Sequence, residues 1–239
     1  MIHKNNKINL VFNRKKEISK YLSPNLFNFK KKTILTCAIR YNKYKYYSEI
    51  SGYLIDLNNL KLKKKIFTLK PQEYFKNQDY YSFLSPFLFK YENKIYCLIQ
   101  ARKYKQNSPK IILLRTKNFI KWHECKLKLF EKNKNLYAPC LISKKNKKYI
   151  FYSKDKNKIY CNIYTNNFSR ILKQTLIYKI KKSKSIIYAP FVIKIKNIFL
   201  MFYSSWKDNF FGNIEILESK DLMTWQKSKY ILPSFKKKI

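Results

Sequence analysis

Several residue types are scarce in this chain. Among its 239 residues are 2 Gly, 2 His and 13 Asp+Glu, and its 5 Cys form no Cys-x-x-Cys pair. With so little His and no paired Cys, we expect neither a metal site nor another cofactor. Most of the cysteines fall within expected strands, as core thiols do, which favours a reducing, cytoplasmic location. No stretch reaches the ~18 apolar residues of a membrane span, and residues 1–20 lack the apolar segment of a signal peptide.

Basic residues, by contrast, are abundant. The 53 Lys+Arg give a formal net charge of +40. An AT-rich genome would account for most of the lysines, together with the many Asn, Ile, Tyr and Phe, but less well for so few acids. The positive electrostatic field of so high a net charge attracts polyanions, such as anionic glycans, phosphorylated surfaces or nucleic acid. Because the lysines are spread along the whole chain and no nucleic-acid-binding motif is present, we rank specific nucleic-acid binding last.

The remaining composition favours a folded all-β domain. Hydrophobic residues make up 46% of the chain and aromatic residues 18%. Tyr, Phe and Ile dominate, and these residues fit the half-buried surface of a pleated sheet. A chain of this length is expected to form one domain over residues 1–239.

A short phrase containing Ser-Pro or Ala-Pro recurs four times, each time followed by a polar turn and a second apolar run. The prolines recur at intervals of roughly 50 to 60 residues, as in four-stranded propeller blades. About thirty residues after each proline comes a polar turn residue, with a large apolar residue four positions later. The phrases are Leu22–Phe27, Leu84–Phe89, Tyr137–Ile142 and Tyr188–Ile193, and the later pairs are Asp56/Leu60, Asn118/Trp122, Asn167/Ile171 and Asp221/Trp225.

These two markers in one period predict a β-propeller, because a single repeat cannot bury its own apolar face. Residues 1–20 form an arm in which Lys7–Phe12 is a plausible strand that could close the ring. A short fifth blade, a four-bladed ring and an incomplete propeller all remain open. The expected blade repeats are residues 21–70, 83–131, 136–180 and 187–233.

In an up-and-down blade, the start of the first strand and the loop from the second to the third strand lie on one face, where propellers generally carry ligands. Four of the thirteen carboxylates fall there and are the candidates for acid–base chemistry: Glu49, Asp79, Asp155 and Asp208. The candidate substrate-binding residues are Arg40, Gln100, Arg102, Tyr137, Tyr188 and Trp206.

Paired guanidiniums suit a carboxylate or phosphate on a substrate, and aromatic rings suit the face of a sugar. Each of these candidate residues also has a purely structural interpretation. Asp79 and Asp208 can cap turns, Arg40 and Arg102 can form a solvated rim, and the tyrosines can complete the inner core.

The chain resembles the five-bladed β-propeller glycosidases, the clan of glycoside hydrolase families 43, 32 and 68. The resemblance spans roughly residues 21 to 233 and lies in the Ala-Pro and Ser-Pro strand openings and in four further segments. These are Lys90–Tyr96, Lys194–Phe199, Tyr203–Trp206 and Ser219–Trp225.

The resemblance implies hydrolysis by two carboxylates, one as acid and one as base or nucleophile. The family's acid is a Glu two positions before a blade proline, and the matching positions here hold Leu22, Leu84, Tyr137 and Tyr188. Either the carboxylates have moved, with Asp79 and Asp208 as the best pair, or the propeller binds a glycan without cleaving it.

Overall fold

In the computed structural model, residues 18–41, 47–59, 61–74, 80–103, 108–125, 135–180, 185–207 and 211–230 are described. Strands and one short 3-10 helix, η1 (Pro71–Glu73), make up the regular structure of this part of the chain. None of its helices is long and apolar enough to cross a membrane. The expected strand Lys7–Phe12 lies outside the described residues.

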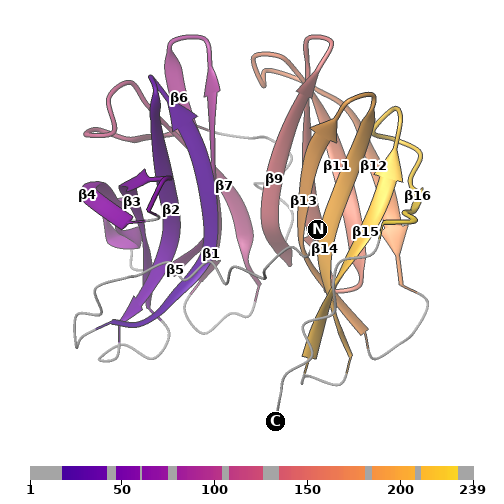
Figure 1. Ribbon diagram of the computed structural model, residues 1–239, viewed down its shortest axis with the longest axis horizontal. Coiled ribbons are helices and arrows are strands. Elements are labelled where there is room, and N and C mark those ends of the chain that lie inside the picture. Colours follow the sequence, from indigo (N-terminus) through magenta and orange to yellow (C-terminus); the bar gives the residue numbers. More distant parts are fainter. Residues whose placement is uncertain are drawn as a thin grey trace.

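The strands form four successive antiparallel meanders, which we call blades one to four. A single parallel pair, Ser48 with Ser82, links blades one and two into one larger sheet. Figure 1 shows blades one and two (indigo to magenta) in one half of the molecule and blades three and four (rose to yellow) in the other. Blade one consists of β1 (Ile18–Phe29), β2 (Lys32–Tyr41), β3 (Ser48–Asp56) and β4 (Lys61–Leu69), and blade two of β5 (Tyr80–Tyr91), β6 (Lys94–Lys103), β7 (Lys110–Thr116) and β8 (His123–Cys125). Blade three consists of β9 (Leu136–Lys144), β10 (Lys147–Lys154), β11 (Lys158–Thr165) and β12 (Ile171–Lys179), and blade four of β13 (Ser185–Ile195), β14 (Ile198–Lys207), β15 (Phe211–Ser219) and β16 (Gln226–Lys227).

The apolar core lies between successive blades. Along a strand, side chains alternate between the two faces of the sheet. Cys97 therefore packs toward blade one while its neighbour Leu98 packs toward blade three, and Ile150 and Phe151 divide in the same way between blades two and four. Three clusters result, joining blades one and two, two and three, and three and four. Within the described residues the blades thus form an arc whose ends are blades one and four, as in an incomplete or five-bladed propeller.

The turn before the last strand of a blade is built as the second sequence marker predicts. In blade two, Asn118 Oδ1 accepts the Ile120 N–H at 3.1 Å, and the Trp122 indole donates to the Phe119 carbonyl at 3.2 Å. In blade four, the Trp225 indole makes the equivalent bond over 2.9 Å. A polar side chain thus caps the turn backbone, and the indole holds the last strand against the blade.

Candidate functional site

The Ser-Pro and Ala-Pro phrases form β-bulges in the first strand of each blade. The residue before the proline has a positive φ in all four: 50° at Ser23, 50° at Ser85, 44° at Ala138 and 53° at Ala189. The pairing register shifts across each of these positions. A residue other than glycine is strained in this region, and a following proline restricts it further, so only small side chains fit easily. Bulges of this kind concentrate beside functional sites.

Contacts between blades show that these bulges lie around one centre. The Ser85 hydroxyl of blade two donates to the Ser23 hydroxyl of blade one at 3.4 Å. The rings of Phe87 in blade two and Phe191 in blade four have centroids 6.3 Å apart. The phrases therefore converge, as the repeat predicts.

Gln100 connects three blades at this centre. Its side chain, on β6 of blade two, is fully buried. The Oε1 atom accepts a hydrogen bond from the Ala138 N–H of blade three at 3.0 Å and one from the Tyr188 hydroxyl of blade four at 2.6 Å. Because these two donors identify that atom as the amide oxygen, the other terminal atom, Nε2, carries the N–H donors. Nε2 is buried and has no acceptor among the described residues.

Tyr137 and Tyr188 lie side by side at this centre. The ring centroids of Tyr137 and Tyr188 are 5.7 Å apart, with 59° between the ring planes. Burial raises the pKa of both hydroxyls, and the charge of Arg102 partly opposes this shift. Both hydroxyls are therefore protonated donors at neutral pH. Tyr137 is only 4% exposed, which favours a role in the inner core over that of an open stacking platform.

Arg102 and Ser153 add further polar atoms that lack a hydrogen-bond partner within the described residues. Arg102 follows Gln100 by two residues on β6, so both side chains emerge on the same face of the blade. Its Nε is buried without an acceptor among the described residues. Ser153 is fully buried opposite Tyr137 in the sheet register, and its Oγ has no hydrogen-bond partner in the described part of the chain. We call the set Gln100, Arg102, Tyr137, Ser153 and Tyr188 the axial centre.

The other two predicted binding residues lie on different blades. Arg40, near the end of β2 in blade one, also has a buried Nε with no acceptor among the described residues. Trp206, near the end of β14 in blade four, is 40% exposed. Within the described part of the chain, no hydrogen bond or ring contact joins either side chain to the axial centre.

Two of the four predicted catalytic carboxylates can be placed. Glu49 is 4% exposed and accepts the Tyr41 hydroxyl at 2.5 Å. Asp155 is exposed in the turn between β10 and β11 and pairs with Lys158 at 3.5 Å. Asp79 and Asp208 lie outside the described residues, so the proposed pairing of carboxylates across the centre stays a prediction.

Sequence reasoning missed one carboxylate in blade four. Glu215 accepts hydrogen bonds from the Tyr203 hydroxyl at 2.9 Å and from the Ser205 hydroxyl at 2.8 Å. Glu215 is not among the four carboxylates predicted from the sequence, and it lies in β15, the third of the four strands of blade four. The signal that could have located it is the register of the preceding strand, which sets Tyr203 directly opposite Glu215. Among the described residues, no group of three or more His, Cys, Asp or Glu could hold a metal ion.

Comparison with solved structures identifies the fold. No protein-family model matches the sequence, and no curated protein matches it either. A structure described as a glycoside hydrolase superposes with a TM-score of 0.70 at 14% identity, over 90% of this chain and 76% of that one. A thermostable family-43 glycoside hydrolase gives a TM-score of 0.66 at 17% identity, over 87% and 72% of the two chains.

A further structure is the alpha-L-arabinanase of Penicillium chrysogenum in complex with arabinobiose. Its TM-score is 0.65 at 12% identity, over 87% of this chain and 66% of that one. The fold is thus that of the β-propeller glycoside hydrolases, in agreement with the resemblance seen in the sequence. At such low identities the likeness defines the architecture, and the chemistry must come from this chain's own residues.

Proposed function

We propose that the protein is a carbohydrate-binding propeller that takes an anionic glycan at the axial centre. The observation that carries this proposal is the state of Gln100. Its oxygen is satisfied by two donors, while its Nε2 is buried with no acceptor in the described part of the chain. Buried polar atoms are normally hydrogen-bonded, so an unpaired donor at a point where three blades meet supports a ligand that supplies the acceptor.

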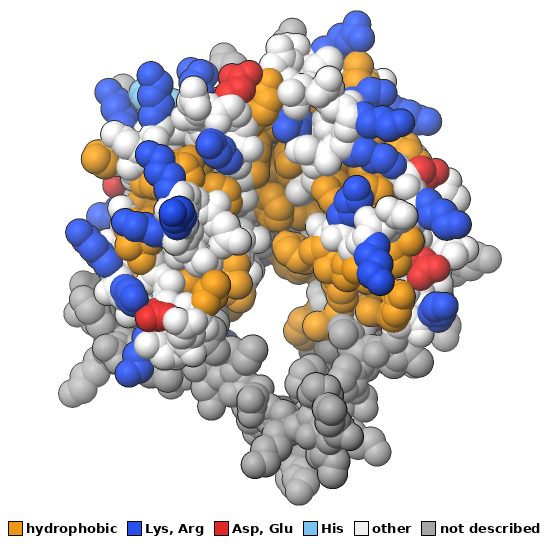
Figure 2. Space-filling model, turned by 45° about the horizontal axis from the view of Figure 1, so that its top comes forward, with side chains coloured by type: hydrophobic (Ala, Val, Ile, Leu, Met, Phe, Trp, Pro, Cys, Tyr) orange, Lys and Arg blue, Asp and Glu red, His pale blue; other side chains and the backbone are white. Residues whose placement is uncertain are grey.

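The charge of the centre supports an anion as that acceptor. Arg102 adds a guanidinium beside the two tyrosines, and its Nε has no acceptor among the residues that the structure describes. A guanidinium binds the carboxylate of a uronic acid, or a sulfate ester, through parallel hydrogen bonds. The Lys and Arg side chains spread over the surface displayed in Figure 2, where acidic ones are few, would draw such a glycan in.

The state of the carboxylates supports glycan binding without hydrolysis. Hydrolysis of a glycosidic bond needs two carboxyl groups facing each other across the substrate. Glu49 is engaged by Tyr41, Asp155 is paired with Lys158, and all four strand openings lack the acid of the glycosidase pattern. We therefore propose that the glycan is held and not cleaved.

Hydrolysis is the second candidate, favoured by the shared glycoside hydrolase fold. It would require Asp79 and Asp208, or another pair among the four candidates, to face each other. If wild type releases sugar from an anionic oligosaccharide and the Asp79→Asn and Asp208→Asn variants do not, the second candidate replaces the first.

The binding experiment is a titration with a uronic-acid oligosaccharide, with a neutral oligosaccharide of equal length as the ligand control. Arg102→Gln should weaken binding of the anionic ligand about tenfold or more, since charge-assisted hydrogen bonds contribute about 1.5–3 kcal/mol. The matched control is Arg170→Gln, an exposed arginine of blade three. Equal losses in both variants would mean that bulk charge alone binds the glycan.

We also propose a reducing, cytoplasmic setting for this activity. The support is that Cys37, Cys97, Cys140 and Cys161 are buried free thiols and Cys125 is a partly buried one. Thiols kept reduced in apolar surroundings are typical of proteins from such compartments.

A further inference from the structure

Three surface depressions occupy related positions in the repeat, at the end of the blade where the first strand turns into the second. They measure about 320 Å³ in blade two, 360 Å³ in blade one and 440 Å³ in blade four. Each is lined by the start of the blade's second strand and by the turn that follows its third strand. These depressions therefore provide internal controls for one another.

The blade-two and blade-four depressions correspond residue by residue. Thr116 lies opposite Ile95, and Ser219 lies opposite Phe199 at the same place in blade four. Arg115 lies opposite His123, as Glu218 lies opposite Gln226. The seven lining positions, blade two first, are Lys94 and Ile198, Arg115 and Glu218, Thr116 and Ser219, Lys117 and Lys220, Asn118 and Asp221, Lys121 and Thr224, and His123 and Gln226.

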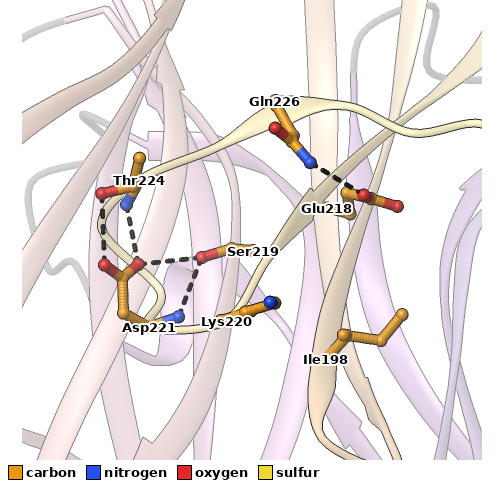
Figure 3. Close-up of a pocket in the computed structure, with 7 residues that line it drawn as sticks. All are labelled: Ile198, Glu218, Ser219, Lys220, Asp221, Thr224 and Gln226. Carbon is orange, nitrogen blue, oxygen red and sulfur yellow. Dashed lines mark hydrogen bonds between the residues drawn. The ribbon is translucent and has the colours of Figure 1, made fainter.

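Charge separates the two depressions. Four of the seven residues that line the blade-two depression are Lys or Arg, one is His and none is acidic. The blade-four depression has two carboxylates, Glu218 and Asp221, and one lysine, Lys220. In Figure 3 these carboxylates accept hydrogen bonds from Gln226, Ser219 and Thr224. The blade-one depression also contains a carboxylate, that of Asp56, which pairs with Lys63 at 3.1 Å.

None of the described residues that line the blade-two depression is acidic, so its cations have no counter-charge within this lining. Arg115 and His123 are direct cross-strand partners, an arrangement that is destabilising when both carry positive charge. Asn118 stands where blade four has Asp221, so an amide replaces a carboxylate; its oxygen caps the turn, and its NH₂ remains as a donor. Glu92 and Glu124 are close in sequence but do not line the depression.

We propose that the blade-two depression binds a tetrahedral oxyanion, the phosphate or sulfate group of an ester. Such a dianion neutralises the facing cations, and the planar guanidinium of Arg115 can bind two of its oxygens at once. The site is distinct from the axial centre. Lys94 begins β6 and Arg102 lies eight residues further along the same strand, a separation of about 26 Å at the rise of an extended strand.

The test uses inorganic phosphate, inorganic sulfate and a hexose phosphate as probes, titrated by calorimetry at low salt. The double variant Arg115→Glu/Lys121→Thr installs the blade-four residues at two positions. The matched control, Lys173→Glu/Lys179→Thr, makes the same charge change on exposed residues of β12. We expect the first variant to weaken phosphate binding at least tenfold and the second less than twofold.

A second measurement uses the unmutated protein, so that the proposal can be tested even if the double variant does not fold. The His123 ring resonances, assigned by comparison with His123→Asn, should shift saturably with phosphate and stay unchanged with a neutral sugar. Preference for the hexose phosphate over inorganic phosphate would identify an ester as the source of the group. Equal loss in both double variants, or no saturable shift of the His123 resonances with phosphate, would overturn the proposal.

Discussion

Replacement of Gln100 by leucine tests whether this side chain holds three blades together. The change removes the oxygen that accepts the Ala138 N–H and the Tyr188 hydroxyl, and leaves both donors buried without an acceptor. Each buried donor left unpaired costs about 1–3 kcal/mol. Leucine also removes the unpartnered Nε2, which offsets one of these losses. The expected net cost is therefore about 1–3 kcal/mol of unfolding free energy.

The assay is urea unfolding followed by tryptophan fluorescence, with thermal unfolding as a second measure. For a domain of this size, 1 kcal/mol corresponds to a fall of about 2–4 °C in Tm. The matched control is Gln226→Leu, which removes an exposed amide that donates to Glu218 at 3.0 Å. That control should change stability by no more than about 0.5 kcal/mol. If Gln100→Leu cost no more than the control, the inter-blade role of Gln100 would be refuted.

Two further predictions concern a turn and the thiols. Hydrogen bonds, chiefly from the Thr224 and Met223 N–H groups, lower the Asp221 pKa to about 2, so its stabilising effect is complete above about pH 4 and is lost as pH falls toward 2. Asp221→Ala should lower the unfolding free energy by about 1 kcal/mol at pH 7 and reduce its decrease between pH 4 and pH 2, as measured by unfolding between pH 2 and pH 7. An unchanged decrease at low pH would contradict this assignment. Burial raises the pKa of the Cys37 and Cys140 thiols to about 12, so both should resist a thiol reagent at pH 8 in native protein and react only after unfolding. Rapid reaction of these two in the native state would show that their blades open.

The architecture could be predicted from local signals. Each bulge requires a small residue before a proline, and each turn before a last strand requires a short polar side chain, so both leave a periodic mark in the sequence. Ser85 and Asn118 are examples, with a positive φ at the first and a backbone cap at the second. These sequence signals can be recognised because the backbone conformation of a single residue determines which residue type is needed there, independent of the neighbouring blades.

The site was predicted less completely because it depends on contacts between blades. The place of Gln100 at the end of a second strand predicts a role in binding, but its bonds to Ala138 and Tyr188 span 38 and 88 residues. Nothing in the local sequence marks such partners. Glu215 was missed for a similar reason, since only the strand register brings it opposite Tyr203. The excess of cations in the blade-two depression is evident only against the spatially equivalent residues of blade four.

Side-chain amide spectroscopy of Gln100 tests the proposed function most directly. The Nε2 proton resonances, assigned with Gln100→Glu, would be followed while a uronic-acid oligosaccharide is added. The account predicts a saturable shift of these resonances together with the Tyr188 ring, lost in Arg102→Gln and absent with a neutral oligosaccharide. Shifts confined to exposed lysines, with the Gln100 amide unchanged at saturation, would contradict glycan binding at the axial centre.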